Sequence, residues 1–88
     1  MTERIFTVKN RLGLHARPAA LFVKEAAAYK SAIVVVKDGL EVNGKSVMGL
    51  MLLAAESGSK LTVRADGPDE AAALAGLAAI FDRKFDED

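Results

Sequence analysis

In the stretch Lys60-Leu61-Thr62-Val63-Arg64-Ala65-Asp66, apolar and polar residues alternate strictly. Successive side chains of a strand point to opposite faces of its sheet, so the pattern predicts a strand with one buried face and one wet face. A sheet that is covered on one side only is typical of antiparallel pairing. We therefore expect an antiparallel sheet with its helices in a single layer.

Three further stretches are predicted to be strands. The strongest signal is Ala32–Lys37, which is dominated by β-branched residues. Asp38-Gly39 then predicts a tight hairpin turn, after which Leu40–Asn43 returns as a short strand. Arg4–Lys9 also alternates and is expected to form the first strand of the chain.

Three segments are predicted to be helices. The first starts at Ala16, after a glycine-containing loop, and is expected to end near Tyr29-Lys30-Ser31. Ser46 is a suitable N-cap for a short helix over Val47–Leu53. The last helix is expected to begin at Gly67-Pro68-Asp69-Glu70, with the proline in its first turn. The apolar stripe of this helix is expected to consist of Leu74, Leu77, Ala78, Phe81 and Phe85. A frayed acidic tail, Asp86-Glu87-Asp88, is expected to follow.

The length and composition predict one small domain, residues 1–88, with the element order β-α-β-β-α-β-α. No apolar run approaches the roughly 20 residues that span a bilayer, and the first residues do not resemble a secretory signal. The chain has no cysteine, which fits a cytoplasmic protein. Twelve basic residues balance twelve acidic ones, so we expect no general affinity for nucleic acid or for an anionic membrane, and without a long apolar run we expect no membrane insertion.

The single histidine of the chain lies in the stretch Leu12-Gly13-Leu14-His15-Ala16-Arg17-Pro18. His15 is expected at or near the N-cap of the first helix, beside unpaired N–H groups and the positive end of the helix dipole. A helix N-terminus binds phosphate readily, and an unprotonated imidazole nitrogen is a nucleophile. The arrangement therefore suits a histidine that accepts and passes on a phosphoryl group, although on spacing alone a role as a cap or a surface residue remains open.

The charges are unevenly distributed along the chain. Residues 1–45 carry eight Lys or Arg and four Asp or Glu, whereas residues 46–88 carry four and eight. Arg11, Arg17 and Lys24 lie close to His15 in the sequence, so we expect cationic surroundings that attract phosphate or an acidic protein surface.

Two motifs together resemble the HPr family, the histidine-containing phosphocarrier proteins of the bacterial phosphotransferase system. They are Gly13-Leu14-His15-Ala16-Arg17-Pro18-Ala19-Ala20 and Asn43-Gly44-Lys45-Ser46-Val47-Met48-Gly49-Leu50-Met51. The similarity extends to the chain length, the order of elements and the separation of the motifs. It implies an α+β fold, an open-faced β-sandwich in which three helices cover one face of a four-stranded antiparallel sheet.

The resemblance also implies a carrier function rather than an enzymatic one. His15 would take a phosphoryl group on Nδ1 from phosphorylated enzyme I and pass it to enzyme IIA proteins. The Arg17 side chain and the backbone N–H groups of Ala16 and Arg17 would hold the phosphoryl oxygens. No cofactor and no metal are implied, and the carrier is expected to be a monomer.

The second motif implies docking and regulation. Ser46 matches a serine that a dedicated kinase phosphorylates in many members of the family, with a phosphorylase and a transcriptional regulator as further partners. The expected partner-binding residues are Ala20, Val47, Met48 and Met51. Without the resemblance, Ser46 is explained by capping alone, and the two methionines are as readily explained as core residues.

Three alternatives remain open at this level. One is service in the nitrogen-related branch of the phosphotransferase system, and another is a chiefly regulatory role once Ser46 is phosphorylated. A small metal-carrying α/β domain is the third alternative, but the chain lacks a Cys-x-x-Cys motif and has one histidine.

Overall fold

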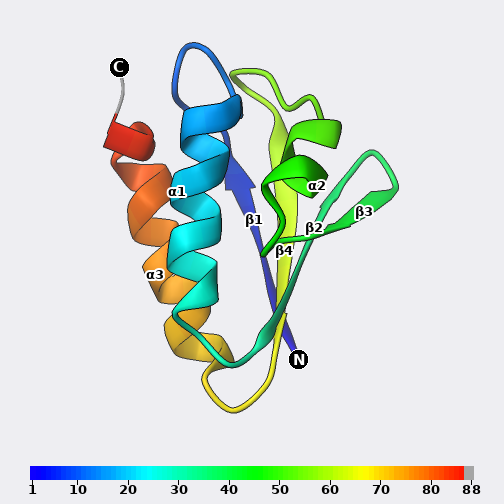
Figure 1. Ribbon diagram of the computed structural model, residues 1–88, viewed down its shortest axis with the longest axis vertical. Helices are drawn as coiled ribbons and strands as arrows, with labels where there is room; N and C mark the ends of the chain where they lie inside the picture. The colour runs from blue at the N-terminus through cyan, green and yellow to red at the C-terminus, as the bar shows by residue number, and fades with distance from the viewer. Residues whose placement is uncertain (87–88) are drawn as a thin grey trace.

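The computed structural model describes residues 1–86, in which strands and helices alternate in the predicted order (Figure 1). The three α-helices lie on one face of the sheet, with α1 and α3 side by side and α2 near β3. The predicted α+β open-faced sandwich is therefore confirmed. The elements are β1 (Thr2–Thr7), α1 (Ala16–Ala27), β2 (Ala32–Lys37), β3 (Leu40–Asn43), α2 (Val47–Leu52), β4 (Lys60–Asp66), α3 (Glu70–Asp82) and the short 3-10 helix η1 (Lys84–Asp86).

The sheet is antiparallel throughout, with the strand order β1-β4-β2-β3. The predicted bounds of β2, β3 and β4 are confirmed. Asp38 and Gly39 have φ angles of 51° and 83°, which match the right-handed twist of a two-residue hairpin. The hairpin prediction is therefore also confirmed.

The alternation that predicted one wet face is confirmed in β4. Leu61, Val63 and Ala65 are buried, and Arg64 lies on the opposite face. Its guanidinium is 3.4 Å from the Glu3 carboxylate of β1 and 3.2 Å from the Glu41 carboxylate of β3. Charged groups thus cover the centre of the open face.

The first strand lies two residues earlier than the predicted Arg4–Lys9. Its pairing with β4 ends where Thr7 faces Lys60, the first residue of β4. Val8 then pairs with the loop that precedes β4. Its N–H donates to the Ser59 carbonyl at 2.8 Å, and its carbonyl accepts from the Gly58 N–H at 2.7 Å. The strand ends because its partner strand ends.

Helix α1 ends at Ala27, before the predicted end near Tyr29-Lys30-Ser31. The backbone N–H groups of Lys30 and Ser31 each donate to the Asp69 carboxylate at 2.9 Å, and the Ser31 hydroxyl donates at 2.5 Å. These bonds turn the chain away from the helix axis towards β2.

Asp69 also explains where α3 begins. It is the N-cap, and the helix starts at Glu70, so Pro68 lies before the helix rather than in its first turn as predicted. Because the Asp69 carboxylate is bonded to the α1–β2 connection, it makes no capping bond to its own helix.

The four phenylalanines form the centre of the core. The ring of Phe81 stacks on Phe6 with centroids 4.7 Å apart and meets Phe22 and Phe85 edge-on at 6.1 and 4.9 Å. Phe85 is buried as predicted, but it belongs to η1, because α3 ends at Asp82 and residues 84–86 have φ between 54° and 59°. Of the predicted acidic tail, Glu87 and Asp88 lie outside the described residues.

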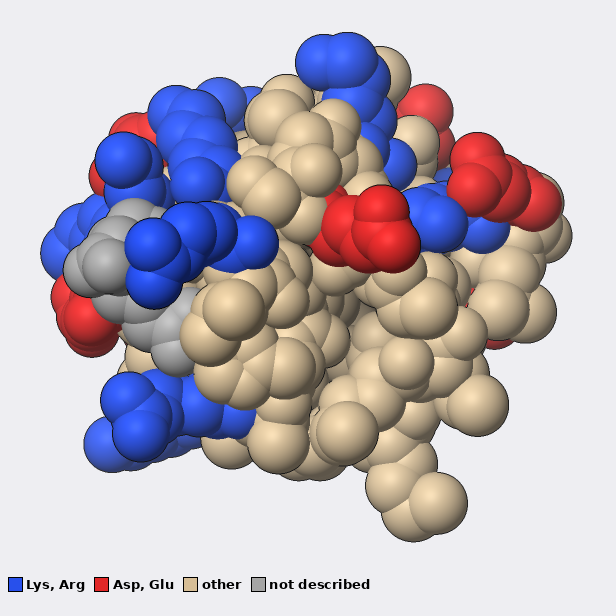
Figure 2. All heavy atoms as spheres, turned by 90° about the horizontal axis from the view of Figure 1, so that it is seen from above, with Lys and Arg blue, Asp and Glu red and all other residues tan. Residues whose placement is uncertain are grey.

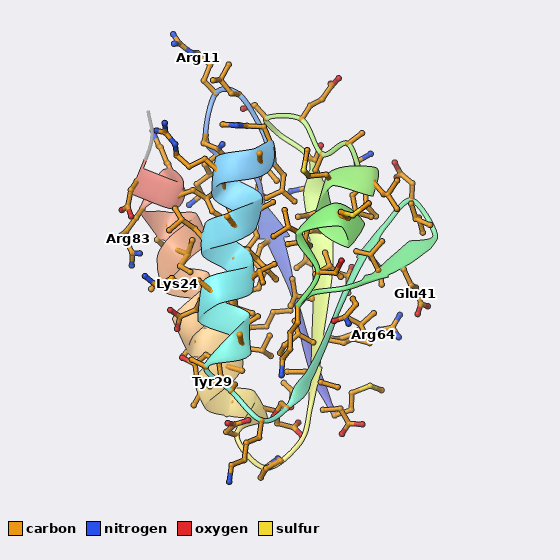
Figure 3. All side chains as sticks on the ribbon, in the orientation of Figure 1. Arg11, Lys24, Tyr29, Glu41, Arg64 and Arg83 are labelled. Carbon is orange, nitrogen blue, oxygen red and sulfur yellow. The ribbon has the colours of Figure 1, made fainter. Side chains whose placement is uncertain are left out.

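One end of the molecule carries the loop before α1, the loop after α2 and the C-terminal end of α3 (Figure 1). Viewed from this end, lysines and arginines gather on one side, and a broad area without charged side chains adjoins them (Figure 2). Arg11 projects from the loop before α1, and Lys24 and Arg83 lie beside α1 and α3 (Figure 3). Lysines and arginines thus gather on one side of the end that carries the loop before α1, and the cationic neighbourhood of His15 stays a prediction.

Candidate phosphoryl-acceptor site

His15 is the N-cap of α1, as predicted, with φ −86° and ψ −168°. Its carbonyl accepts the first helical hydrogen bond, from the Ala19 N–H at 3.0 Å. The imidazole itself makes no capping bond to the first turn. The backbone of His15 therefore starts the helix, and its imidazole lies beside the positive end of the helix dipole.

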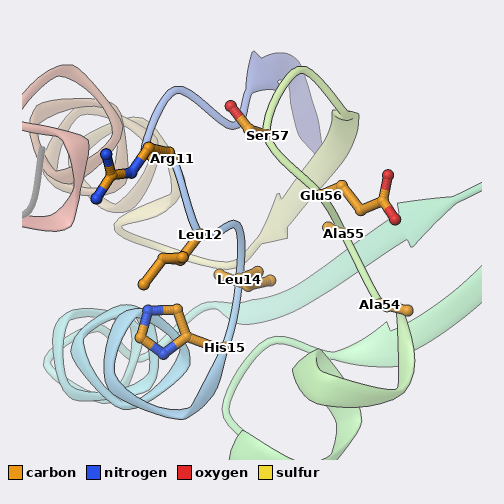
Figure 4. Close-up of a pocket in the computed structure, with 8 residues that line it drawn as sticks. All are labelled: Arg11, Leu12, Leu14, His15, Ala54, Ala55, Glu56 and Ser57. Carbon is orange, nitrogen blue, oxygen red and sulfur yellow. The ribbon is translucent and has the colours of Figure 1, made fainter.

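The imidazole borders an open groove of about 550 Å³ between two loops (Figure 4). One wall comes from the loop before α1 and the other from the segment that links α2 to β4. Polar and apolar groups are mixed in the lining, which suits a site that meets a charged group on a protein surface. The lining residues are Arg11, Leu12, Leu14, His15, Ala54, Ala55, Glu56 and Ser57.

The two loops are joined by backbone contacts directly behind His15. The Leu14 N–H donates to the Ala55 carbonyl at 2.8 Å. Gly13 has φ +75°, and a Cβ at this position would lie 2.5 Å from the same carbonyl oxygen. Only glycine therefore allows both this backbone conformation and this close approach.

Arg17 and Ala16 occupy the first turn of α1 and are exposed. Their backbone N–H groups belong to the first turn of the helix, where no intrahelical acceptor is available. Arg17 is not among the residues that line the groove. The structure thus places both residues beside His15 and leaves the long Arg17 side chain at the surface.

Ser46 is the N-cap of α2, as predicted. Its hydroxyl accepts a hydrogen bond from the Gly49 N–H at 3.0 Å, and its carbonyl accepts from the Leu50 N–H at 3.0 Å. The helix ends at Leu52, one residue before the predicted end. The serine is half-buried, so its hydroxyl is part of the helix cap and still lies near the surface.

The candidate partner-binding residues lie on α1 and α2, which contact each other. Met48 is 79% exposed, Met51 and Ala20 are also exposed, and Val47 is partly buried against the core. Both methionines are therefore surface rather than core residues, and their role in partner binding stays a prediction.

Two exposed leucines near the site were missed by the sequence analysis. Leu12 is 70% exposed on the rim of the groove, and Leu52 is 71% exposed on α2 beside Met48 and Met51. In the sequence, the exposure of Leu12 is indicated only by its position in a loop. The exposure of Leu52 is indicated only by its position on a short helix that also buries Leu50. Residues 54–57 were missed because nothing in the sequence connects that loop with His15.

Within residues 1–86, no group of three or more His, Cys, Asp or Glu side chains could hold a metal ion. In the same part of the chain, no helix combines the length and the hydrophobicity needed to cross a membrane.

Comparison with known proteins agrees with this geometry. The family model described as "PTS HPr component phosphorylation site" matches residues 2–83. Over 88 residues the chain is 47% identical to phosphocarrier protein HPr of Treponema pallidum, and the match covers 100% of both chains. Over 84 residues it is 49% identical to the HPr-like protein Crh of Halalkalibacterium halodurans, covering 96% of this chain and 100% of that relative.

Among solved structures, HPr-C-His from Thermoanaerobacter tengcongensis superimposes with a TM-score of 0.96 at 44% identity. The match covers 100% of this chain and 99% of that one. The chain belongs to the HPr family, the phosphocarrier proteins of the phosphotransferase system.

Proposed function

We propose that this protein carries a phosphoryl group on Nδ1 of His15, accepted from phosphorylated enzyme I and passed to enzyme IIA proteins. The observation that carries the proposal is the position of His15: it caps α1 through its backbone while its imidazole borders an open groove. An imidazole held this way is accessible to a protein donor and lies next to a natural anion site.

The transfer is a substitution at phosphorus. The lone pair of Nδ1 attacks, the bond from phosphorus to the donor breaks, and the ring keeps its proton on Nε2. The N–H groups of Ala16 and Arg17 and the Arg17 guanidinium bind the phosphoryl oxygens. Helix-terminus stabilisation is worth about 0.3 to 2 kcal/mol, which is small enough for the group to leave again.

Partners dock on the neighbouring apolar surface formed by Ala20, Val47, Met48 and Met51. Met48 and Met51 are exposed and flexible, so they adapt to unlike surfaces such as enzyme I and several enzyme IIA proteins. In this proposal the protein is a monomeric cytoplasmic carrier that forms one 88-residue domain, needs no cofactor and turns over no small molecule. It binds neither nucleic acid nor a membrane.

A second candidate function is regulation through Ser46, and the hydroxyl at the N-terminus of α2 favours it. A phosphate there is favourable for the helix and places negative charge beside the docking surface. A serine kinase, a phosphorylase and a transcriptional regulator would be the partners. Service in the nitrogen-related branch instead of sugar uptake is a variant of the same carrier proposal.

The direct test is incubation with enzyme I and phosphoenolpyruvate, followed by mass spectrometry. We expect one acid-labile phosphoryl group on His15 and none on the variant His15→Ala. If an active enzyme I leaves the wild-type protein unmodified, the carrier proposal is wrong. An acid-stable phosphate on Ser46 in cell extracts would support the regulatory function.

A further inference from the structure

Asn10 is a polar side chain buried in the loop that leads to His15. Its exposed fraction is 0%, and among the described residues the only other polar side chain in this class is Ser31, which belongs to the opposite end of α1. A buried amide is costly unless its polar atoms are hydrogen-bonded. Its presence in the core therefore points to a specific role, which the proposed phosphoryl chemistry does not itself use.

The contacts of Asn10 close the loop into a ring. Its Nδ2 donates to the Gly13 carbonyl at 2.6 Å, while the Gly13 N–H donates to the Asn10 carbonyl at 3.2 Å. Both polar groups of Gly13 are thus held by one residue. Because Nδ2 is buried, loop conformations that break its bond to Gly13 would leave a donor unpaired in the core, so the bond favours the observed conformation.

The residues between Gly13 and His15 are also held in place. The Ala55 carbonyl fills the space where a Gly13 Cβ would lie, at 2.5 Å, and accepts the Leu14 N–H at 2.8 Å. Leu14 is buried in the core, and the next residue is His15. The backbone that enters α1 is therefore fixed from both sides.

We propose that Asn10 is a positioning residue for phosphoryl transfer, which holds the loop so that the His15 imidazole stands in line with the N–H groups of Ala16 and Arg17. The inference rests on the proposed function of His15. Loss of the Asn10 amide lets the loop shift, so Nδ1 and the anion site no longer meet the phosphorus together. A misplacement of about 1 Å far from the reacting atoms can cost on the order of a hundredfold in rate.

Because Asn10 is buried, its positioning role can be distinguished from a role in partner binding. The side chain does not reach the surface and does not line the groove, so it cannot contact enzyme I. We therefore expect a change in kcat with KM unchanged, whereas loss of a docking residue changes KM.

The sharpest variant is Asn10→Asp, which keeps the shape of the side chain but replaces the Nδ2 donor with an oxygen facing the Gly13 carbonyl. Asn10→Ala, which removes the amide without adding a charge, is the second variant. Ser31→Ala is the matched control, because it removes the hydroxyl of the other buried polar residue, which donates to Asp69 at 2.5 Å, and leaves the His15 loop intact. Circular dichroism and thermal unfolding establish that each variant is folded at the assay temperature.

The measurement is the steady-state rate of His15 phosphorylation by phosphorylated enzyme I over a range of carrier concentrations. We expect kcat to fall by about tenfold or more in both Asn10 variants, with KM within about twofold of the wild type, and both parameters to be unchanged in Ser31→Ala. An unchanged kcat in either folded Asn10 variant, or an equal loss in Ser31→Ala, overturns the inference. Absence of phosphorylation in the wild type would instead refute the proposed function.

Discussion

The Arg17 side chain is proposed to bind the phosphoryl group through its planar fork, which contacts two oxygens at once. Arg17→Lys keeps the charge and loses the fork, so we expect kcat/KM for phosphorylation of His15 to fall by about tenfold. Stopped assays with phosphorylated enzyme I measure the effect. Arg64→Lys is the control, since Arg64 lies on the open face of the sheet between Glu3 and Glu41 and should leave the rate unchanged. Equal rates for Arg17→Lys and the wild type would remove Arg17 from the site.

Asp69 determines how stability responds to acid. The hydrogen bond from the Ser31 hydroxyl, followed by that from the Lys30 N–H, lowers the pKa of the Asp69 carboxyl from 3.8 to about 2. A lowered pKa means that the carboxylate stabilises the fold above pH 3.8, and that this contribution is lost as the pH falls from 3.8 to about 2. We expect the urea midpoint of the wild type to drop across this range.

The variant Asp69→Asn isolates that contribution. Its amide cannot accept all three hydrogen bonds, so we expect a lower urea midpoint than the wild type at neutral pH and convergence of the two proteins near pH 2. A gap between the two midpoints that stays constant with pH would show that the carboxylate charge is not the cause.

At the scale of the element, α2 depends on its cap. Ser46→Ala deletes the acceptor for the Gly49 N–H, and we expect the free energy of unfolding to fall by about 1 kcal/mol. Ser46→Asp keeps an acceptor and adds negative charge at the helix N-terminus, so its stability should stay close to that of the wild type. Urea unfolding measures both.

The same Ser46→Asp variant tests regulation. Because its fold is preserved, any change in affinity for enzyme I or for a regulator reports the new charge beside Met48 and Met51. We expect weaker binding of enzyme I, measured by calorimetry, since that charge opposes an acidic partner. Unchanged affinity for every partner would count against regulation through this serine.

The C-terminal end of α2 contains a strained residue. Ala54 follows the helix with φ +50°, and its N–H donates to the Met51 carbonyl at 3.1 Å. Glycine is favoured in this left-handed position, so Ala54→Gly should raise the free energy of unfolding by about 0.5 to 1 kcal/mol. Ala75→Gly, in the middle of α3, should lower it by a similar amount. The same sign for both variants in urea titrations would contradict this account of the cap.

At the scale of the whole molecule, the net charge is zero but the charges are unevenly distributed. Lysines and arginines gather on one side of the end that holds His15 (Figure 2). Attraction between such a surface and an acidic partner is screened by salt. We expect KM for phosphorylation by enzyme I to rise with ionic strength while kcat stays constant. A KM that is independent of salt would mean that docking depends on the apolar surface alone.

Local patterns in the sequence were sufficient to predict most of the fold. Three of the four strands have the predicted bounds, because β-branched runs, strict alternation and the Asp38-Gly39 turn act over a few residues. The N-cap positions of His15 and Ser46 also follow from neighbouring residues. The predicted end of α1 and the predicted start of α3 were wrong because Asp69 bonds to Ser31, which lies 38 residues away in the sequence.

The sequence by itself therefore determined the order of the elements, the single wet face of the sheet and the residue that heads α1. Only the tertiary structure showed that the loop before His15 is held by the buried Asn10 amide and braced by the Ala55 carbonyl. That loop has no periodicity, and its conformation depends on a backbone that approaches from the far end of α2. Contacts between such distant segments form only when the core assembles, which is why the geometry around His15 could not be predicted from its neighbours.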